Sequence, residues 1–147
     1  MPSSKPDWWT SDEWSTPPDY FAKVNARLGP FDLDACCRHE TAKAPAFFVK
    51  GDDALTQDWF GNVWVNPPYS EPAKWCEKAV MEIAHDHVRQ VVMLLPAAVD
   101  THWFHNWVVP YATVEFIRGR LRFIDWTGQP STGSPKGGNV LAIYRNE

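Results

Sequence analysis

The sequence predicts a single α/β domain of three layers, α/β/α, in which helices cover both faces of a mixed β-sheet. Short apolar runs alternate along the chain with segments of helical periodicity, a pattern typical of parallel strands joined by helices. Towards the C-terminus a terminal pair of apolar runs indicates additional edge strands. A length of 147 residues with 44% hydrophobic content suffices for one core and leaves no room for a separate recognition domain.

The N-terminal half is expected to contain one helix and three short strands. Thr16 is a candidate cap for the helix, with Pro17 at its first position, and apolar side chains recur on one face until Gly29-Pro30 ends it. The strands are expected at residues 31–34, 46–49 and 63–65. The residues up to Asp12 have the composition of a flexible arm, so the folded domain is expected to span 13–147.

The C-terminal half is expected to contain two helices, at 72–85 and 101–108, around a continuous apolar strand at 90–95. Further strands are expected at 113–117, 120–124 and 140–144, with a mobile loop rich in Gly, Pro, Ser and Thr at 127–139. In an open α/β sheet, ligands bind at the carboxyl ends of the strands. The polar residues expected there are Asp34, Asp52, Asp53 and Asn66.

Composition excludes several classes of protein. No apolar run is long enough to span a bilayer, and the polar N-terminus lacks the apolar core of a signal peptide, so a cytoplasmic protein is expected. Three cysteines, of which Cys36 and Cys37 are adjacent, do not indicate a disulfide framework. A formal net charge of −4 argues mildly against a nucleic-acid partner, although a local cluster of arginines can outweigh it.

The most informative motif is Asn66-Pro67-Pro68-Tyr69, which directly follows an apolar strand. The amine of a base or of an amide is a weak nucleophile because its lone pair is delocalised. The side-chain oxygen of Asn66 and the carbonyl of Pro67 can each accept one N–H and aim that lone pair at an electrophilic methyl group. The prolines stiffen the loop, and Tyr69 offers a face for stacking. The motif predicts an amine methyltransferase that uses S-adenosylmethionine, and the alternative is a Pro-rich turn.

Other segments surround this motif in a characteristic order: residues 12–17, 31–36, Asp58-Trp59 and 119–123. With them, the chain resembles the phage-type Dam-like DNA adenine-N6 methyltransferase family over nearly its whole length. The resemblance implies a compact, Rossmann-like S-adenosylmethionine-dependent methyltransferase fold and DNA as the partner. It also implies that a phage-encoded member acts in the bacterial host cell. The target adenine would be flipped out of the duplex and stacked on Tyr69.

The resemblance further implies a cofactor site, formed by Trp14, Thr16, Pro17, Asp34, Ala35, Cys36, Asp52, Asp53 and Asn66. Thr16-Pro17 corresponds to the motif that packs against the methionine part of the cofactor, and Asp34 to the carboxylate near its amino group. Either Asp52 or Asp53 would meet the ribose or the adenine ring, and both are explained equally well as turn residues. Few residues separate Asp34 from Asn66 along the chain, so one helix or strand of the complete methyltransferase fold should be missing between them.

Residues expected to contact DNA are Tyr69, Trp103, Arg118, Arg120, Arg122, Phe123 and Lys136. The three arginines alternate with Gly119 and Leu121, so on a strand they would share one face and could follow the phosphates. The histidines at 85, 87, 102 and 105 favour solvated helix ends, and no metal site is expected.

Two alternative functions stay open. An asparagine at this position is also found in methyltransferases that act on RNA bases or on protein glutamine, so the tetrapeptide by itself does not identify the substrate. The stretch after Asp34 lacks the glycines that usually allow a close approach to the cofactor. The chain could therefore be a catalytically silent nucleic-acid-binding protein of the same fold.

Overall fold

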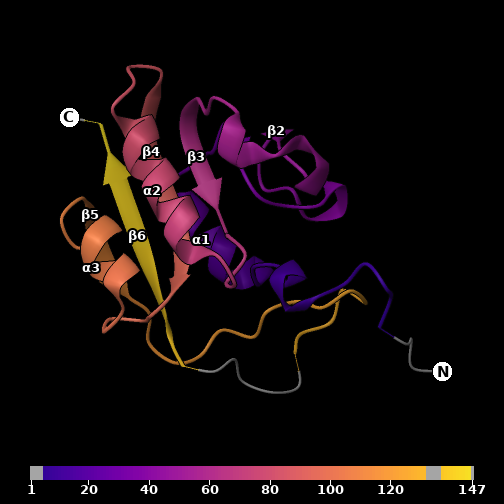
Figure 1. Ribbon diagram of the computed structural model, residues 1–147. Coiled ribbons are helices and arrows are strands. Elements are labelled where there is room, and N and C mark those ends of the chain that lie inside the picture. Colours follow the sequence, from indigo (N-terminus) through magenta and orange to yellow (C-terminus); the bar gives the residue numbers. More distant parts are fainter. Residues whose placement is uncertain (1–4, 132–136, 147) are drawn as a thin grey trace.

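The computed structural model describes residues 5–131 and 137–146. One mixed sheet has the strand order β2-β1-β3-β4-β6-β5 (Figure 1). Its strands are β1 (Leu33–Asp34), β2 (Ala46–Phe47), β3 (Gly61–Val65), β4 (Val88–Pro96), β5 (Ala112–Phe116) and β6 (Asn139–Arg145). The first four are parallel, whereas β6 runs antiparallel between β4 and β5. This confirms the predicted mixed sheet.

Helices cover both faces of this sheet: α1 (Pro18–Leu28), α2 (Pro72–Ile83) and α3 (His102–Trp107). Figure 1 shows α2 and α3 in front of the sheet and α1 behind it. Val63 and Val65 of β3 belong to the core cluster that includes residues of α2 and α3, while Trp64 between them packs with Val24 of α1. Because successive side chains of a strand point to opposite faces, one apolar run supplies both cores. The three-layer prediction is confirmed.

The helices begin where their sequences direct. α1 and α2 start with Pro18 and Pro72, at a position where the missing N–H of proline is not needed for the helix. The N-terminal cap predicted at Thr16 is wrong, because Pro17 occupies the cap position and provides no side-chain hydrogen bond. The Thr16 hydroxyl instead accepts a hydrogen bond from Asn66.

The strand expected at 120–124 is also wrong. Within this segment only Ile124 forms β-bridges, and these are isolated bridges to Ser15 and Pro130. Gly119 has a φ of +76°, which interrupts the extended conformation after β5. The chain then leaves the sheet and runs to the N-terminal segment, as the orange and indigo traces of Figure 1 show.

The described part of the N-terminal arm packs against the domain. Trp9 is 7% exposed, and its ring contacts Trp14 and Trp126 edge to face, with centroids 4.9 Å apart in both pairs. Burying an aromatic ring in this way is among the larger apolar contributions that a side chain makes. Within residues 5–12, therefore, aromatic packing holds the chain in place where the sequence suggested a loose arm.

The connection between β1 and β3 is short, as predicted. It contains β2 and three single-turn 3-10 helices, η2 (His39–Thr41), η3 (Lys50–Asp52) and η4 (Ala54–Thr56), and no α-helix. Residues 35–60 are all described, so the expected missing element is confirmed. Among the described residues, none of the helices has the length and hydrophobicity needed to cross a bilayer.

Candidate active site

The carboxyl ends of the parallel strands bring the predicted motifs to one edge of the sheet. β1 and β3 pair in parallel with Asp34 opposite Trp64, and the Ala35 N–H donates to the Trp64 carbonyl at 3.0 Å. Asn66 therefore emerges beside the segment that follows Asp34. β6 begins at the same edge with Asn139, opposite Pro96 at the end of β4. This is the edge at which open α/β sheets bind ligands.

The amide of Asn66 has a fixed orientation. Its Nδ2 donates to the Thr16 hydroxyl at 3.1 Å and to the Trp14 carbonyl at 3.4 Å. Because a carbonyl can only accept, the NH₂ end must face these two groups, and Oδ1 points away from them. Among the described residues, no group donates a hydrogen bond to Asn66 Oδ1 or to the Pro67 carbonyl. Two acceptors on consecutive residues are thus left to bind N–H groups.

The loop that carries this motif is held from the N-terminal side. Asp12 lies in the 3-10 helix η1 (Ser11–Glu13), and its carboxylate accepts from the Ser70 hydroxyl at 2.6 Å and from the Ser70 N–H at 3.2 Å. The Thr16–Asn66 hydrogen bond holds the first residue of the motif, and the Asp12–Ser70 contacts hold the residue that directly follows it. The segment 12–17, which the sequence linked to the cofactor, therefore also positions the motif.

Tyr69 is anchored through its hydroxyl, which accepts from Asn139 Nδ2 at 2.6 Å and donates to the Leu94 carbonyl at 3.5 Å. Its ring meets Phe123 edge to face, with centroids 6.0 Å apart and an interplanar angle of 81°. Burial raises the pKa of the Tyr69 phenol, so it stays protonated and neutral. The residue as a whole remains partly exposed. A planar group of fixed orientation with some free surface is suited to stacking.

Asp34 is a buried carboxyl group, 1% exposed, at the end of β1. Its two oxygens accept from the backbone N–H groups of Cys36 at 3.1 Å and Lys43 at 2.9 Å. Burial raises the pKa of Asp34 to about 7, although both N–H groups act in the opposite direction. A cationic ligand would favour the ionised form, so this site is suited to an ammonium group.

The other expected cofactor residues differ in burial. Ala35 is buried and Cys36 is half-buried beside Asp34, whereas Asp52 and Asp53 are exposed. The Asp52 carboxylate accepts from the Val49 N–H at 2.8 Å and so caps the turn of η3. Asp53 adopts a left-handed conformation with φ of +51°, and its carboxylate makes no hydrogen bond within the described residues. These contacts favour the turn interpretation for Asp52 and leave Asp53 the better candidate for an adenosine contact.

The expected DNA residues are divided by the sheet. Trp103 packs against the core on the α2 and α3 face, whereas Tyr69 and Phe123 pack on the α1 face, so the structure does not bring Trp103 to them. Arg118, Arg120 and Arg122 are exposed, while Ile117, Leu121 and Phe123 face the core. The predicted alternation is confirmed, although the segment is not a strand. Lys136 lies outside the described residues.

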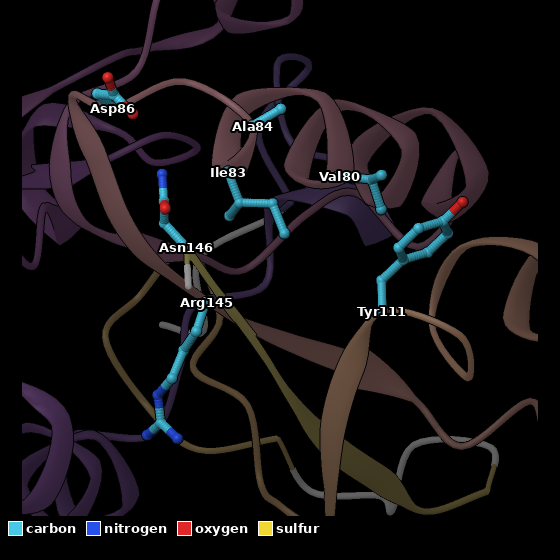
Figure 2. Close-up of a pocket in the computed structure, with 7 residues that line it drawn as sticks. All are labelled: Val80, Ile83, Ala84, Asp86, Tyr111, Arg145 and Asn146. Atoms are coloured by element: carbon cyan, nitrogen blue, oxygen red, sulfur yellow. The ribbon is translucent and has the colours of Figure 1, made fainter.

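A pocket of about 470 Å³ lies at the opposite end of the sheet (Figure 2). Ile83 and Ala84 at the end of α2 line it together with Arg145 and Asn146 at the end of β6. Because β6 is antiparallel to β4, this is the amino end of the parallel strands. The pocket is therefore separate from the Asp34 and Asn66 edge. Within the described part of the chain, no group of three metal-ligating side chains is present.

Comparison with known proteins bears directly on this site. A family model described as DNA N-6-adenine-methyltransferase (Dam) matches residues 3–147, the whole of the motif-bearing region. The chain belongs to the Dam family. A DNA N-6-adenine-methyltransferase of Escherichia phage T1 is 36% identical over 91% of this chain and 63% of the phage protein. One from Haemophilus phage HP1 (strain HP1c1) is 33% identical over 78% of this chain and 67% of the relative.

This Dam-family chain thus spans 63% of the length of the phage T1 relative. A solved structure, that of the 23S rRNA methyltransferase ErmE, matches 90% of this chain and 69% of that one with a TM-score of 0.51. The sequence identity is 14%, so the likeness concerns the fold. It confirms the predicted Rossmann-like methyltransferase fold.

Sequence reasoning missed Asn139 and assigned Asp12 to the arm. Asn139 was placed in a loop because Gly, Pro and Ser precede it, and periodicity gives no partner for a single polar residue. A usable signal was its position, directly after Gly137-Gly138 and directly before an apolar strand. Asn66 is likewise a polar residue next to an apolar strand, although it follows its strand. For Asp12, the signal was its place in the resemblance.

Proposed function

We propose that this Dam-family chain transfers a methyl group from S-adenosylmethionine to the exocyclic N6 of adenine in DNA. The observation that carries the proposal is the fixed amide of Asn66, which leaves Oδ1 and the Pro67 carbonyl without internal donors. An exocyclic amine has two N–H groups, one for each acceptor. The names of the phage relatives, both DNA N-6-adenine-methyltransferases, support adenine in DNA as the substrate.

The residues at the end of β1 fit S-adenosylmethionine. The buried Asp34 carboxyl is suited to the amino group of the methionine part, because that cation would compensate the burial of the charge. Ala35 is small enough to let a ligand approach the backbone, in place of the glycine found in many nucleotide sites. When bound, the cofactor supplies an electrophilic methyl group on a positively charged sulfur.

The protein residues then act on the base. A base within a duplex cannot reach Asn66, so it must leave the stack at a cost of a few kcal/mol. Stacking on the anchored Tyr69 ring can return about 1–3 kcal/mol. Asn66 Oδ1 and the Pro67 carbonyl accept the two N–H groups, which turns the lone pair towards the methyl group and stabilises positive charge on nitrogen. Once nitrogen carries the methyl group, its surplus proton is acidic and passes to solvent.

Nucleoside analysis tests the proposal most directly. The protein and labelled S-adenosylmethionine are incubated in three parallel reactions, which contain unmethylated plasmid DNA, total RNA or a protein mixture. We expect label in N6-methyldeoxyadenosine from the DNA sample. Label in RNA or in methylglutamine would replace DNA as the substrate. Absence of both label and calorimetric heat with S-adenosylmethionine would identify a catalytically silent nucleic-acid-binding protein.

The arginine segment, residues 117–124, is expected to contact DNA phosphates. β5 runs parallel to β4, so the segment leaves the sheet at the active-site edge, and Phe123 brings it against Tyr69. Replacing both Arg118 and Arg120 with Gln should make the slope of log K against log salt shallower by about 1.8, since each phosphate contact contributes about 0.9.

Arg89 and Arg145 provide a matched control. Both are exposed, and both lie at the opposite end of the sheet, where β4 begins and β6 ends. Replacing them with Gln changes the net charge by the same amount and should leave the salt slope at its parental value. If the two double variants have equal salt slopes, the arginine segment contacts phosphates no more than the control arginines do.

A further inference from the structure

Asn139 is a buried polar residue beside the candidate active site that the proposed mechanism does not use. It is 4% exposed and begins β6, opposite Pro96 at the end of β4. Its Nδ2 donates to the Tyr69 hydroxyl at 2.6 Å and to the Leu95 carbonyl at 3.1 Å. The NH₂ group of this buried asparagine therefore donates only to the Tyr69 side chain and to the backbone of the neighbouring strand, β4.

The direction of these hydrogen bonds is determined by the acceptors. The Leu95 carbonyl can only accept, so the NH₂ end of Asn139 must face it, and the same NH₂ group then donates to Tyr69. The Tyr69 hydroxyl directs its own proton to the Leu94 carbonyl at 3.5 Å. The chain of donors runs from Asn139 through Tyr69 to β4, and it fixes the tip of the Tyr69 ring at the carboxyl end of that strand.

The Asn139 amide donates a hydrogen bond to the Tyr69 hydroxyl, while its own oxygen is left without a donor. Its Oδ1 is buried and has no hydrogen-bond partner among the described residues. Buried polar atoms without a partner are rare and unfavourable, so a side chain selected only for packing would not be expected to leave one. The orientation of the amide thus serves the hydroxyl of Tyr69.

The backbone around Asn139 is also held rigidly. The Gly138 carbonyl accepts from the Ala97 N–H at 2.9 Å, and the Asn139 carbonyl accepts from the Ile117 N–H at 3.3 Å. Ile117 is the first residue of the arginine segment. Asn139 therefore joins the stacking residue, the end of β4 and the start of the surface expected to bind DNA.

We propose that Asn139 is a positioning residue that holds the Tyr69 ring in the orientation in which the target base stacks. The inference rests on the proposed methyl transfer to DNA. It predicts that loss of the Asn139 side chain slows methyl transfer without weakening the cofactor. It also predicts that the effect operates through the Tyr69 hydroxyl.

The test compares Asn139→Ala, Tyr69→Phe, the double variant and Asn62→Ala. Asn62 is a matched control, since it is also buried and its Nδ2 donates to two backbone carbonyls, Leu28 at 2.8 Å and Pro30 at 2.9 Å, at the opposite end of the sheet. Tyr69→Phe removes the same hydrogen bond from the other side without a cavity. One measurement is single-turnover methyl transfer to unmethylated plasmid DNA with saturating S-adenosylmethionine, and another is cofactor affinity by calorimetry.

We expect Asn139→Ala to lower the rate constant for transfer by at least about tenfold, with cofactor affinity within about twofold of the parent. Tyr69→Phe should show a similar loss, and the double variant should be little slower than either single one, because both remove one interaction. Asn62→Ala should lose stability and keep the rate. A parental rate for Asn139→Ala, or a full additional loss in the double variant, would overturn the proposal.

A measurement on the free protein separates this inference from the proposed function. Three-bond NMR couplings to Cγ of Tyr69 report whether the ring keeps one χ1 rotamer. We expect a single rotamer in the parent and averaging in Asn139→Ala. If the parent transfers no methyl group to DNA, the proposed function fails, and the couplings still decide whether Asn139 fixes Tyr69. A single rotamer in both proteins would overturn the inference.

Discussion

Replacing Asn66 with Ala is expected to slow methyl transfer to DNA by about 10²–10³-fold, the effect of deleting one preorganised partner of a transition state. The variant loses Oδ1, one of two acceptors for the reacting amine, and leaves Asp34 intact. S-adenosylmethionine should therefore bind with parental affinity. Single-turnover transfer to unmethylated DNA and calorimetry with the cofactor measure the two quantities separately.

Two further variants test the physical reason. Asn66→Asp keeps an oxygen acceptor, so it should retain more activity than Asn66→Ala. Thr16→Val removes the hydroxyl that accepts from Asn66 Nδ2 at 3.1 Å and should produce a smaller loss, because the amide can then rotate. If Asn66→Ala turns over at close to the parental rate, the acceptors identified here do not drive the reaction.

The affinity for S-adenosylmethionine is expected to rise with pH until it levels off above about 7, the pKa of Asp34 in the cofactor-free protein. Below that value the carboxyl is protonated and must lose its proton to bind a cation, which costs up to about tenfold in affinity per pH unit. Asp34→Asn should bind the cofactor weakly at every pH. Calorimetric titrations from pH 5.5 to 8 measure this dependence.

In the cofactor-free protein, the free energy of unfolding should fall as the pH rises, whereas the affinity for the cofactor rises. The folded pKa of Asp34, about 7, lies above the value of about 3.9 for an unfolded aspartate. The folded state therefore binds the extra proton between these values, and the stability that Asp34 contributes is lost as the pH rises through about 7. Thermal unfolding at pH 6 and pH 8, with and without S-adenosylmethionine, measures this loss and its recovery.

Asp32→Asn is the matched control for both measurements. Asp32 precedes Asp34 by two residues, but its side chain is 47% exposed and pairs with Arg89 at 3.0 Å. Its replacement should leave the pH dependence of cofactor binding unchanged. An affinity that is flat across this pH range in the parent, or equal in parent and Asp34→Asn, would remove Asp34 from the cofactor site.

The sequence predicted strands well where burial on both faces left a continuous apolar run, as in β3, β4 and β6. It failed at 120–124, where the alternating burial is real but arises because Leu121 and Phe123 pack in the core cluster that also contains Val24 of α1. Periodicity reports which side chains are buried, and it does not report whether the backbone finds a neighbouring strand. The same limit explains Thr16, whose hydroxyl suits a helix cap and is used by a residue fifty positions later in the chain.

The sequence by itself determined the α/β fold, the Asn66 to Tyr69 motif and the edge of the sheet where Asp34 and Asn66 emerge, because these depend on local propensity and on the direction of parallel strands. Only the tertiary structure decided how those groups are oriented. Three hydrogen bonds join distant parts of the chain: Ser70 to Asp12, Asn66 to Thr16 and Asn139 to Tyr69. Such contacts depend on where folding places two side chains relative to each other, and no local pattern in either segment encodes that distance.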